Sequence, residues 1–216
     1  MAGHVPGARG RRLSAGQQVG AYTLLRQLGS GAAADVWLAA APGGARVAVK
    51  RLLANASPAA ERALAAEVAV LARLEHPGIV RLLSSGRTGG RPWFVMEVLD
   101  GMDGLALGER LRARPVAERV QRVRETGVQV AEALAYLHRS GLVHRDVKPA
   151  NVLWAAGRAV LADFGLATAE GTDADGFAGS VGWAAPEALL GARPAAAGDQ
   201  FSFGLVLYWL LTGSRP

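Results

Sequence analysis

The first half of the chain alternates short apolar runs with turns that contain glycine. Pro42-Gly43-Gly44 separates two of these runs and is typical of a hairpin connection. The pattern predicts strands over residues 22–28, 36–40, 46–50, 81–83 and 93–98. We therefore expect a first half that is rich in β-structure.

A different spacing marks the helices. Ser57 and Pro58 are typical of an N-cap and a first helical residue, and they predict a helix that runs to about Glu75 and ends before Pro77. In the second half, apolar positions recur at intervals of three and four and predict a long helix that ends at Gly141. Its apolar stripe consists of Val116, Val120, Val123, Gly127, Val130, Leu134 and Leu137.

Shorter segments complete the expected architecture. Residues 100–108 are rich in glycine and predict a linker, and residues 152–154 and 159–161 predict a small hairpin. The apolar run 201–211 is too short to span a bilayer and predicts a buried helix that starts near Asp199. Strands in the first half and helices in the second predict an α+β fold.

Composition narrows the class of protein. Hydrophobic residues make up 50% of the chain, enough for one core or for two small lobes. There is no cysteine, which excludes disulfides and thiolate metal sites and suits a reducing cytoplasm. Residues 1–20 contain no apolar central run of the kind found in signal peptides. We therefore expect a cytoplasmic location and no membrane segment in this chain.

The net charge of +6 would suit a nucleic-acid partner. The arginines, however, are scattered along the predicted helices beside glutamates, and no aromatic residues interleave with them to stack on bases. Only Arg9, Arg11 and Arg12 cluster, in a glycine-rich segment that we expect to belong to a disordered basic tail over residues 1–18. We expect no nucleic-acid partner; salt-dependent binding to DNA would favour that alternative.

Lysine occurs only twice, at Lys50 and Lys148, against 22 arginines. Lysine carries a compact, mobile ammonium and arginine a rigid planar fork, so this bias points to positions where generic positive charge is not sufficient. Asparagine is equally scarce, and one of the two, Asn151, lies five residues after Asp146. The rarest polar residues therefore gather around one candidate site.

Six motifs follow one another along the chain. They are the glycine-containing run 29–36, Val47-Ala48-Val49-Lys50, Glu67, His144-Arg145-Asp146 with Lys148 and Asn151, Asp163-Phe164-Gly165, and Ala185-Pro186-Glu187. In their order and spacing, from about Val19 to its last residue, the chain resembles a bacterial Hanks-type serine/threonine protein kinase. One such motif would be weak evidence, whereas six in register are specific.

The resemblance implies a two-lobed protein-kinase-like fold. Its β-rich N-lobe would cover residues 19–99 and its helical C-lobe residues 100–216. The chain stops where the long central helix of the family's C-lobe ends, so we expect a truncated C-lobe that lacks its last helices, as in a gene fragment. Glu187 would then be a partly buried carboxylate without the arginine that it pairs with in the family.

The resemblance also implies ATP and Mg²⁺ as cofactors. Asp146 would accept the proton of the substrate hydroxyl, and Lys148 would neutralise the transferring phosphate. Asn151 and Asp163 would offer to Mg²⁺ the oxygen ligands that this cation prefers.

The resemblance implies that the nucleotide is contacted by a glycine-containing turn, by two strands and by the segment that connects the two lobes. The family has a third glycine where this chain has Ala34, which we interpret as a modest change. Lys50 would contact the α- and β-phosphates. The residues expected at the nucleotide are Leu28, Gly29, Ser30, Gly31, Ala32, Ala33, Ala34, Val36, Ala48, Lys50, Met96, Glu97, Leu99 and Leu153.

Glu67 would orient Lys50, and the helical pattern supports this pairing independently. Its neighbours at three and four residues are all apolar, and a carboxylate in an apolar stripe is costly unless it finds a cation. The alternative is that Glu67 tilts to solvent at the edge of the stripe. For Asp146 and Asn151, a turn with local hydrogen bonds would explain either residue alone, but not their joint spacing with Lys148 and Asp163.

We therefore expect a serine/threonine protein kinase that transfers the γ-phosphate of ATP to Ser or Thr hydroxyls of a protein substrate. The position of Lys148 two residues after Asp146 resembles the serine/threonine class. The alternative is an inactive fragment or pseudokinase that binds nucleotide as a scaffold, and ATP-dependent phosphate incorporation separates the two.

The segment between Asp163 and Glu187 offers three hydroxyl candidates for control of activity, namely Thr168, Thr172 and Ser180. We expect Ser180 to be structural. We expect Thr172 to be phosphorylated by the protein itself, because the resemblance implies that Arg145 needs an anion from this segment. The alternative is that a carboxylate supplies the anion, from Glu170, Asp173 or Asp175.

Overall fold

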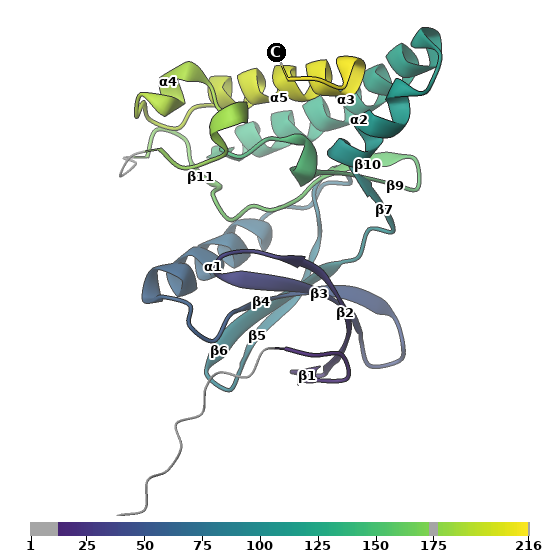
Figure 1. Ribbon diagram of the computed structural model, residues 1–216. Coiled ribbons are helices and arrows are strands. Elements are labelled where there is room, and N and C mark those ends of the chain that lie inside the picture. The colour runs from purple at the N-terminus through teal and green to yellow at the C-terminus, as the bar shows by residue number, and fades with distance from the viewer. Residues whose placement is uncertain (1–12, 173–176, 216) are drawn as a thin grey trace, which may run out of the picture. The chain divides into compact units, whose positions relative to one another are not determined.

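The computed structural model describes residues 13–172 and 177–215 (Figure 1). The chain divides into two compact units. The first comprises the residues up to Val68 together with Leu82–Val98, and the second comprises Ala69–Arg81 and Leu99–Pro216.

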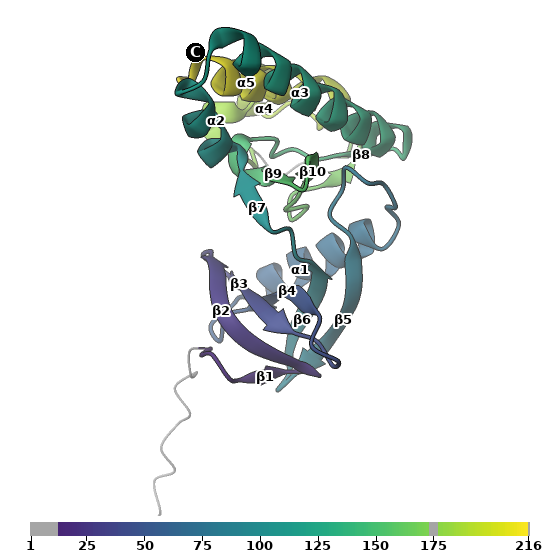
Figure 2. The same ribbon diagram turned by 90° about the vertical axis from the view of Figure 1, so that its right-hand side faces the viewer.

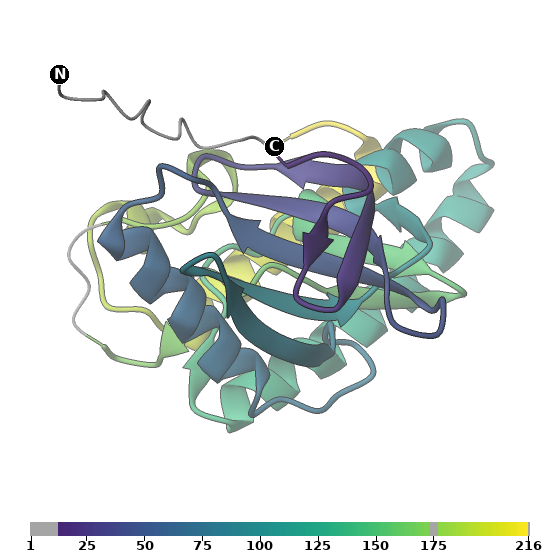
Figure 3. The same cartoon turned by 90° about the horizontal axis from the view of Figure 1, so that it is seen from below.

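The first unit is a six-stranded antiparallel sheet with one helix, α1 (Pro58–Leu71), beside it (Figure 3). The strands lie in the order β1-β2-β3-β4-β6-β5. Their bounds are β1 (Gln18–Val19), β2 (Tyr22–Ser30), β3 (Ala34–Ala40), β4 (Arg46–Leu52), β5 (Leu82–Thr88) and β6 (Arg91–Glu97). All five predicted strands are present, and each is longer than the apolar run that predicted it.

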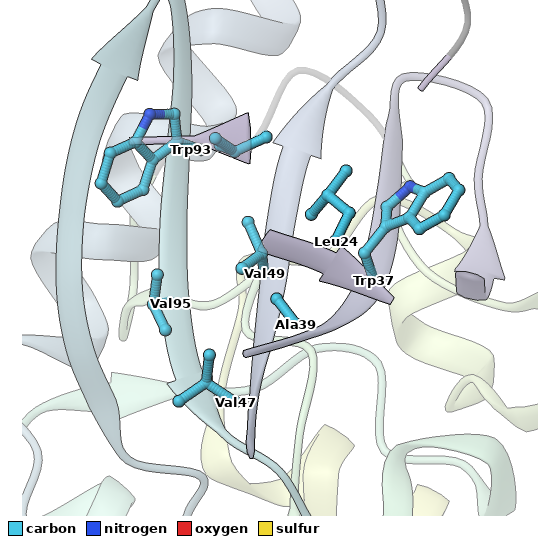
Figure 4. Packing of buried hydrophobic residues seen from close by; sticks show 8 residues of the cluster. Leu24, Trp37, Ala39, Val47, Val49, Trp93 and Val95 are labelled. Carbon is cyan, nitrogen blue, oxygen red and sulfur yellow. The ribbon is translucent and has the colours of Figure 1, made fainter. Parts of the chain in front are cut away.

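An apolar cluster lies on one face of this sheet (Figure 4). Val47 and Val49 of β4 and Trp93 and Val95 of β6 are two residues apart in each strand, and alternation places them on the same face. A fully buried side chain of this size stabilises the fold by about 1.5–3 kcal/mol. The remaining buried members are Val19, Leu24, Trp37 and Ala39.

Residues 13–18, which composition assigns to the basic tail, take part in this unit. The Leu13 side chain packs against the apolar cluster, and the Gly16 N–H donates to the Leu24 carbonyl at 2.8 Å. Gln18 and Val19 pair with the start of β2. The prediction of disorder is therefore wrong for these residues, because an apolar anchor and a hairpin outweigh their glycine and polar content; Arg9, Arg11 and Arg12 lie outside the described residues.

Over its described residues, the second unit combines four helices with short strands (Figure 2). The helices are α2 (Gly104–Arg112), α3 (Val116–Arg139), α4 (Pro186–Leu189) and α5 (Ala196–Thr212). The strands β7 (Gly101–Asp103), β9 (Val152–Ala155) and β10 (Arg158–Leu161) form a sheet in the order β10-β9-β7, and β8 (Leu142–Val143) pairs with β11 (Thr168–Ala169). Two 3₁₀ turns, η1 (Pro149–Asn151) and η2 (Val181–Trp183), complete the unit.

Residues 69–81 follow the first stretch of the first unit in sequence but belong to the second unit. The Val80 N–H donates to the Leu161 carbonyl at 2.9 Å, and the Leu161 N–H donates to the Gly78 carbonyl at 2.8 Å. The Tyr136 hydroxyl accepts from the Glu75 N–H at 3.1 Å. These long-range bonds join the segment after α1 to β10 and α3.

The predicted linker at residues 100–108 is wrong. Instead, β7 pairs with β9, and α2 begins at Gly104. The Asp103 carboxylate caps α2 by accepting from the Ala106 N–H at 2.9 Å. Gly108 is required by packing, because a Cβ there would lie 2.6 Å from the Trp209 indole nitrogen of α5. The glycines that suggested a linker therefore permit close helix packing.

Three helices differ from their predicted extent or burial. α1 ends at Leu71, not near Glu75, because Arg73 and Leu74 donate to carbonyls three residues back, which tightens the chain before Pro77. The long helix is confirmed as α3, but Val116 and Val120 of its predicted stripe are exposed. The predicted helix at 201–211 is confirmed as part of α5, and several of its apolar side chains are exposed, namely Phe201, Tyr208 and Leu211.

No helix in the described ranges is both long enough and apolar enough to cross a bilayer.

Candidate active site

Lys50 and Glu67 form an ion pair within the first unit. The Lys50 Nζ lies 2.7 Å from Glu67 Oε1 and 2.8 Å from Oε2, so the ammonium contacts both carboxylate oxygens. Because β4 side chains alternate and Val49 belongs to the apolar cluster, Lys50 points to the opposite face, where α1 presents Glu67.

This ion pair is largely shielded from water. The Glu67 side chain is 4% exposed and the Lys50 side chain 16%. Leu64, Val70 and Leu71 on the same side of α1 are buried as well, so Glu67 does not tilt to solvent. A buried carboxylate of this kind requires its cation, since removal of one partner leaves an uncompensated charge.

Arg51, the next residue of β4, has a different environment. Its guanidinium is buried and donates to the Thr88 carbonyl at 3.2 Å. Burial, followed by repulsion from Arg91, lowers the pKa of Arg51 below its ordinary value. The two adjacent cations of β4 therefore have different partners: Lys50 pairs with Glu67 of α1, and Arg51 bonds to the Thr88 carbonyl.

The glycine-containing turn connects β2 and β3. The Gly31 N–H donates to the Ala34 carbonyl at 2.8 Å and closes the turn. No described atom lies within 4 Å of the position that a Cβ would take at Gly29, so the backbone there is open to close approach. The predicted residues of this turn lie at the end of β2 (Leu28, Gly29 and Ser30), in the turn (Gly31, Ala32 and Ala33) and at the start of β3 (Ala34 and Val36).

Asp35 holds this turn and was not predicted. Its carboxylate is buried and accepts from the Ser30 hydroxyl at 2.7 Å and from the Gln27 amide at 3.0 Å. The available signal was a single acidic residue in a run of small and apolar residues. Its hydrogen bonds fix the two strands on either side of the turn.

The other predicted nucleotide contacts are split between the units. Ala48 of β4 lies opposite Met96 of β6, and Val47 lies opposite Glu97, so these positions adjoin in the sheet. Leu99 and Leu153 are half-buried residues of the second unit.

Asp146, Lys148 and Asn151 converge in the second unit. The Lys148 Nζ donates to Asp146 Oδ2 at 2.6 Å, and the Asn151 amide nitrogen donates to the Asp146 carbonyl at 2.8 Å and to Oδ2 at 3.1 Å. The Asn151 amide oxygen remains as the group that could bind a metal ion.

Asp146 carries one unused oxygen. Its side chain is 8% exposed, and Oδ1 is buried with no hydrogen-bond partner among the described residues. Buried polar atoms are nearly always paired, so an orphaned acceptor of this kind indicates a functional position. An acceptor held beside a lysine and an asparagine suits the removal of a proton from a hydroxyl.

Asp199 of α5 holds the backbone of this loop and was not predicted as a site residue. Its Oδ2 accepts from the His144 N–H and its Oδ1 from the Arg145 N–H, both at 2.8 Å. The His138 ring adds a third bond to Oδ2 at 2.8 Å. Arg145 has a φ of 66°, a strained conformation that such bonds can stabilise. An acidic residue at the start of an apolar helix was the available signal.

His144 acts as a packing residue. Its ring is fully buried, lies 4.7 Å from the Phe164 ring, and bonds through Nε2 to the Ala162 carbonyl at 3.2 Å. Asp163 lies between Ala162 and the buried Phe164, has a φ of 60°, and exposes its side chain. Its neighbours are thus fixed while its carboxylate is accessible to solvent.

The segment after Asp163 is bonded to the rest of the unit through β11, which pairs with β8, and through side-chain hydrogen bonds. The Lys148 Nζ donates to the Ser180 hydroxyl at 2.8 Å, so Ser180 is joined to the loop that carries Asp146. At Gly179 the φ is 140°, and a Cβ would lie 2.8 Å from the Arg145 carbonyl. The Glu170 carboxylate accepts from the Ala196 N–H at the start of α5, at 3.0 Å.

One expectation about this segment changes and one stays a prediction. Glu170 bonds to the Ala196 N–H of α5 through one carboxylate oxygen, so its role as the alternative anion for Arg145 stays a prediction, and Asp173 and Asp175 lie outside the described residues. Glu187 is exposed in α4, so the expectation of a partly buried carboxylate is wrong; α4 is a single short turn at the surface.

The donor chemistry of the second unit fits Mg²⁺. The Asn151 amide oxygen and the exposed Asp163 carboxylate are hard oxygen donors. Within the described ranges no group of three or more His, Cys, Asp or Glu side chains could hold a metal ion by itself. Magnesium sites often use one or two protein ligands and complete their shell with waters and phosphate oxygens, so two donors are sufficient.

We compared the sequence with known protein families and with curated proteins. The protein kinase domain family matches residues 22–216. The chain is similar to the serine/threonine-protein kinase PknF of Mycobacterium tuberculosis, with 39% identity over 94% of this chain and 45% of that protein. PknJ of the same organism is 39% identical over 94% of this chain and 36% of its own length. CBL-interacting protein kinase 4 of Oryza sativa subsp. japonica is 39% identical over 92% of this chain and 46% of its own length. The chain thus spans less than half the length of these relatives.

Proposed function

We propose that this chain, which belongs to the protein kinase domain family, is the catalytic core of a serine/threonine protein kinase. It would transfer the γ-phosphate of ATP to a Ser or Thr hydroxyl of a protein substrate. The Pγ–O bond to ADP breaks as the bond from the hydroxyl oxygen to Pγ forms, and the hydroxyl proton passes to Asp146.

The observation that carries this proposal is the orphaned Asp146 Oδ1. Lys148 and Asn151 occupy the other oxygen of the carboxylate, so Oδ1 is the acceptor available to a substrate hydroxyl. Phosphoryl transfer depends mainly on positioning and charge stabilisation, and Asp199 fixes the loop that carries this acceptor.

Residues of the two units are assigned separate tasks. The Lys50–Glu67 pair presents a fixed ammonium for the α- and β-phosphates, and the open backbone at Gly29 leaves room for phosphate. Leu28, Ala48, Met96, Glu97, Leu99 and Leu153 would contact the nucleoside. Asn151 and Asp163 would hold Mg²⁺, which supplies charge neutralisation to the phosphates when bound.

The choice of serine and threonine as acceptors rests on Lys148. Its ammonium bridges Asp146 and Ser180, and so joins the catalytic loop to the segment that precedes α4. The relatives whose names state a residue class are serine/threonine kinases. We also propose that the protein phosphorylates itself at Thr172, whose side chain is exposed.

The test is incorporation of radioactive phosphate from Mg·[γ-³²P]ATP into casein, followed by phosphoamino-acid analysis. The expected products are phosphoserine and phosphothreonine, with the Asp146→Asn variant as the matched control. Phosphate incorporation no greater than that of Asp146→Asn would overturn the proposal and favour a scaffold.

A further inference from the structure

A pocket of about 420 Å³ lies within the second unit, apart from the residues assigned to catalysis. It is lined by α2, the first half of α3, β7 and β9. Trp154 of β9 contributes to it, whereas Leu153, its neighbour with a proposed nucleotide contact, points to the opposite face of the strand by alternation. The pocket is therefore a separate feature.

Apolar side chains line part of this pocket. Leu107 and Leu111 of α2 are buried, and Met102 and Trp154 are half-buried. The exposed parts of Met102 and Trp154 leave apolar area that a ligand side chain could cover, above the buried Leu107 and Leu111. A volume of about 420 Å³ is near the lower end of small-ligand sites, which suits one or two side chains of a bound segment.

Three arginines surround the apolar part from different elements. Arg110 projects from α2, Arg114 from the turn before α3, and Arg122 from α3. Arg122 is already oriented, because its guanidinium lies 5.0 Å from the Trp154 ring centre and 2.9 Å from the Glu125 carboxylate. Arg114 is 3.8 Å from Glu118. Both ion pairs are solvent-exposed, and such pairs are weak enough to exchange for an external carboxylate.

The surrounding segment is basic as a whole. The pocket lining carries three arginines and two glutamates, a net charge of +1, and it lies in a segment, residues 104–125, whose six arginines and three glutamates give a net charge of +3. A positive field over an apolar pocket favours a negatively charged partner and disfavours a basic one.

We propose that this pocket binds an acidic peptide segment that inserts an apolar side chain between α2 and α3. The apolar side chain would cover Met102 and Trp154, and flanking carboxylates would pair with Arg110, Arg114 and Arg122. The inference does not depend on phosphoryl transfer, because none of these residues is assigned to catalysis or to ATP.

The test uses a fluorescein-labelled peptide of eight residues, with a central leucine between glutamates, and fluorescence anisotropy. The double variant Arg110→Glu/Arg114→Glu should bind it at least about tenfold more weakly, since each lost charge-assisted contact is a large part of such an affinity. Arg124→Glu is the matched control, because it reverses an exposed charge on α3 outside the pocket and should retain affinity within about twofold.

Further arms identify the ligand chemistry. A peptide with lysines in place of the glutamates, and one with serine in place of leucine, should bind much more weakly. No binding of the acidic peptide, an equal loss in Arg124→Glu, or equal binding of the lysine peptide would overturn the proposal. Single-stranded oligothymidine that binds as tightly as the peptide would show a general polyanion surface instead. Thermal unfolding of each variant verifies that it is folded, and ATP-dependent phosphorylation of casein gives an independent check on the proposed kinase activity.

Discussion

The Glu170 carboxylate accepts a hydrogen bond from the backbone N–H of Ala196, the first residue of α5. Ala195, at the N-cap position, has no side chain that could do so. The Gly171 N–H adds a bond to the Pro194 carbonyl at 2.8 Å. The segment after Asp163 is thereby joined to the helix whose Asp199 holds the catalytic loop.

Glu170→Ala should lower the free energy of unfolding by about 1 kcal/mol, the usual effect of losing a helix cap. Glu170→Gln should retain most of the stability, because the amide oxygen can still accept from the Ala196 N–H. Thermal unfolding of the three proteins measures the difference. Equal melting temperatures for Glu170→Ala and wild type would show that this hydrogen bond does not stabilise the fold.

Lys50→Met should abolish phosphate transfer and also destabilise the protein. The methionine leaves Glu67 as a buried carboxylate without its cation, and such losses cost about 3–5 kcal/mol. The double variant Lys50→Met/Glu67→Leu should recover much of the stability but no activity. Urea unfolding and phosphorylation assays separate the two effects, and undiminished stability of Lys50→Met would contradict the buried-pair argument.

The same site permits a test of geometry. Lys50→Arg keeps the charge but replaces a compact ammonium by a planar fork, so we expect turnover close to that of Lys50→Met. Its thermal stability should exceed that of Lys50→Met because Glu67 keeps a cation. Turnover equal to wild type would rule out a role that depends on the shape of the ammonium.

Asp146→Asn and Asp163→Asn should impair different steps. Asp146→Asn removes the proposed proton acceptor, so we expect normal Mg·ATP binding and loss of turnover. Asp163→Asn removes a proposed metal ligand, so we expect weaker nucleotide binding that is apparent only with Mg²⁺ present. Titration with a fluorescent ATP analogue, with and without Mg²⁺, measures both, and equal losses in the two variants would contradict these roles.

Local patterns were sufficient to predict most of the fold. Strand runs, the Ser57–Pro58 start and the stripe from Val123 to Leu137 all depend on short-range spacing that survives in the structure. Residues 100–108 were wrongly predicted as a linker, because glycine is common in flexible linkers and also where two helices pack closely. Gly108 is small so that Trp209 can approach, a reason that lies about a hundred residues further along the chain and is invisible to local patterns.

The site was predictable where residue type and spacing carry chemistry. Lys50, Glu67, Asp146, Lys148 and Asn151 were named from the sequence, and the structure brings each set together within its own unit. The supporting residues were missed. Asp35 and Asp199 act through backbone and side-chain hydrogen bonds to other segments, and only three-dimensional packing reveals those partners.

Phosphorylation of Thr172 should control activity. The Thr172 hydroxyl donates to the Ala169 carbonyl at 2.6 Å and its side chain is exposed, so a phosphate can be added without opening the core. A phosphate adds close to two negative charges and would supply an anion for Arg145. Glu170, one of the three carboxylates that could supply that anion instead, already bonds to the first N–H of α5.

Mass spectrometry after incubation with Mg·ATP should therefore find phosphate on the peptide that contains Thr172. Thr172→Ala should lose the modification and much of the activity, whereas Thr172→Ser should retain both, and Asp146→Asn should remain unmodified because it cannot catalyse the transfer. Full activity of Thr172→Ala, with no phosphate on any peptide spanning residues 168–180, would reject this control. Asp173 or Asp175 would then be the better source of the anion, and Asp173→Asn with Asp175→Asn would be expected to lower activity in its place.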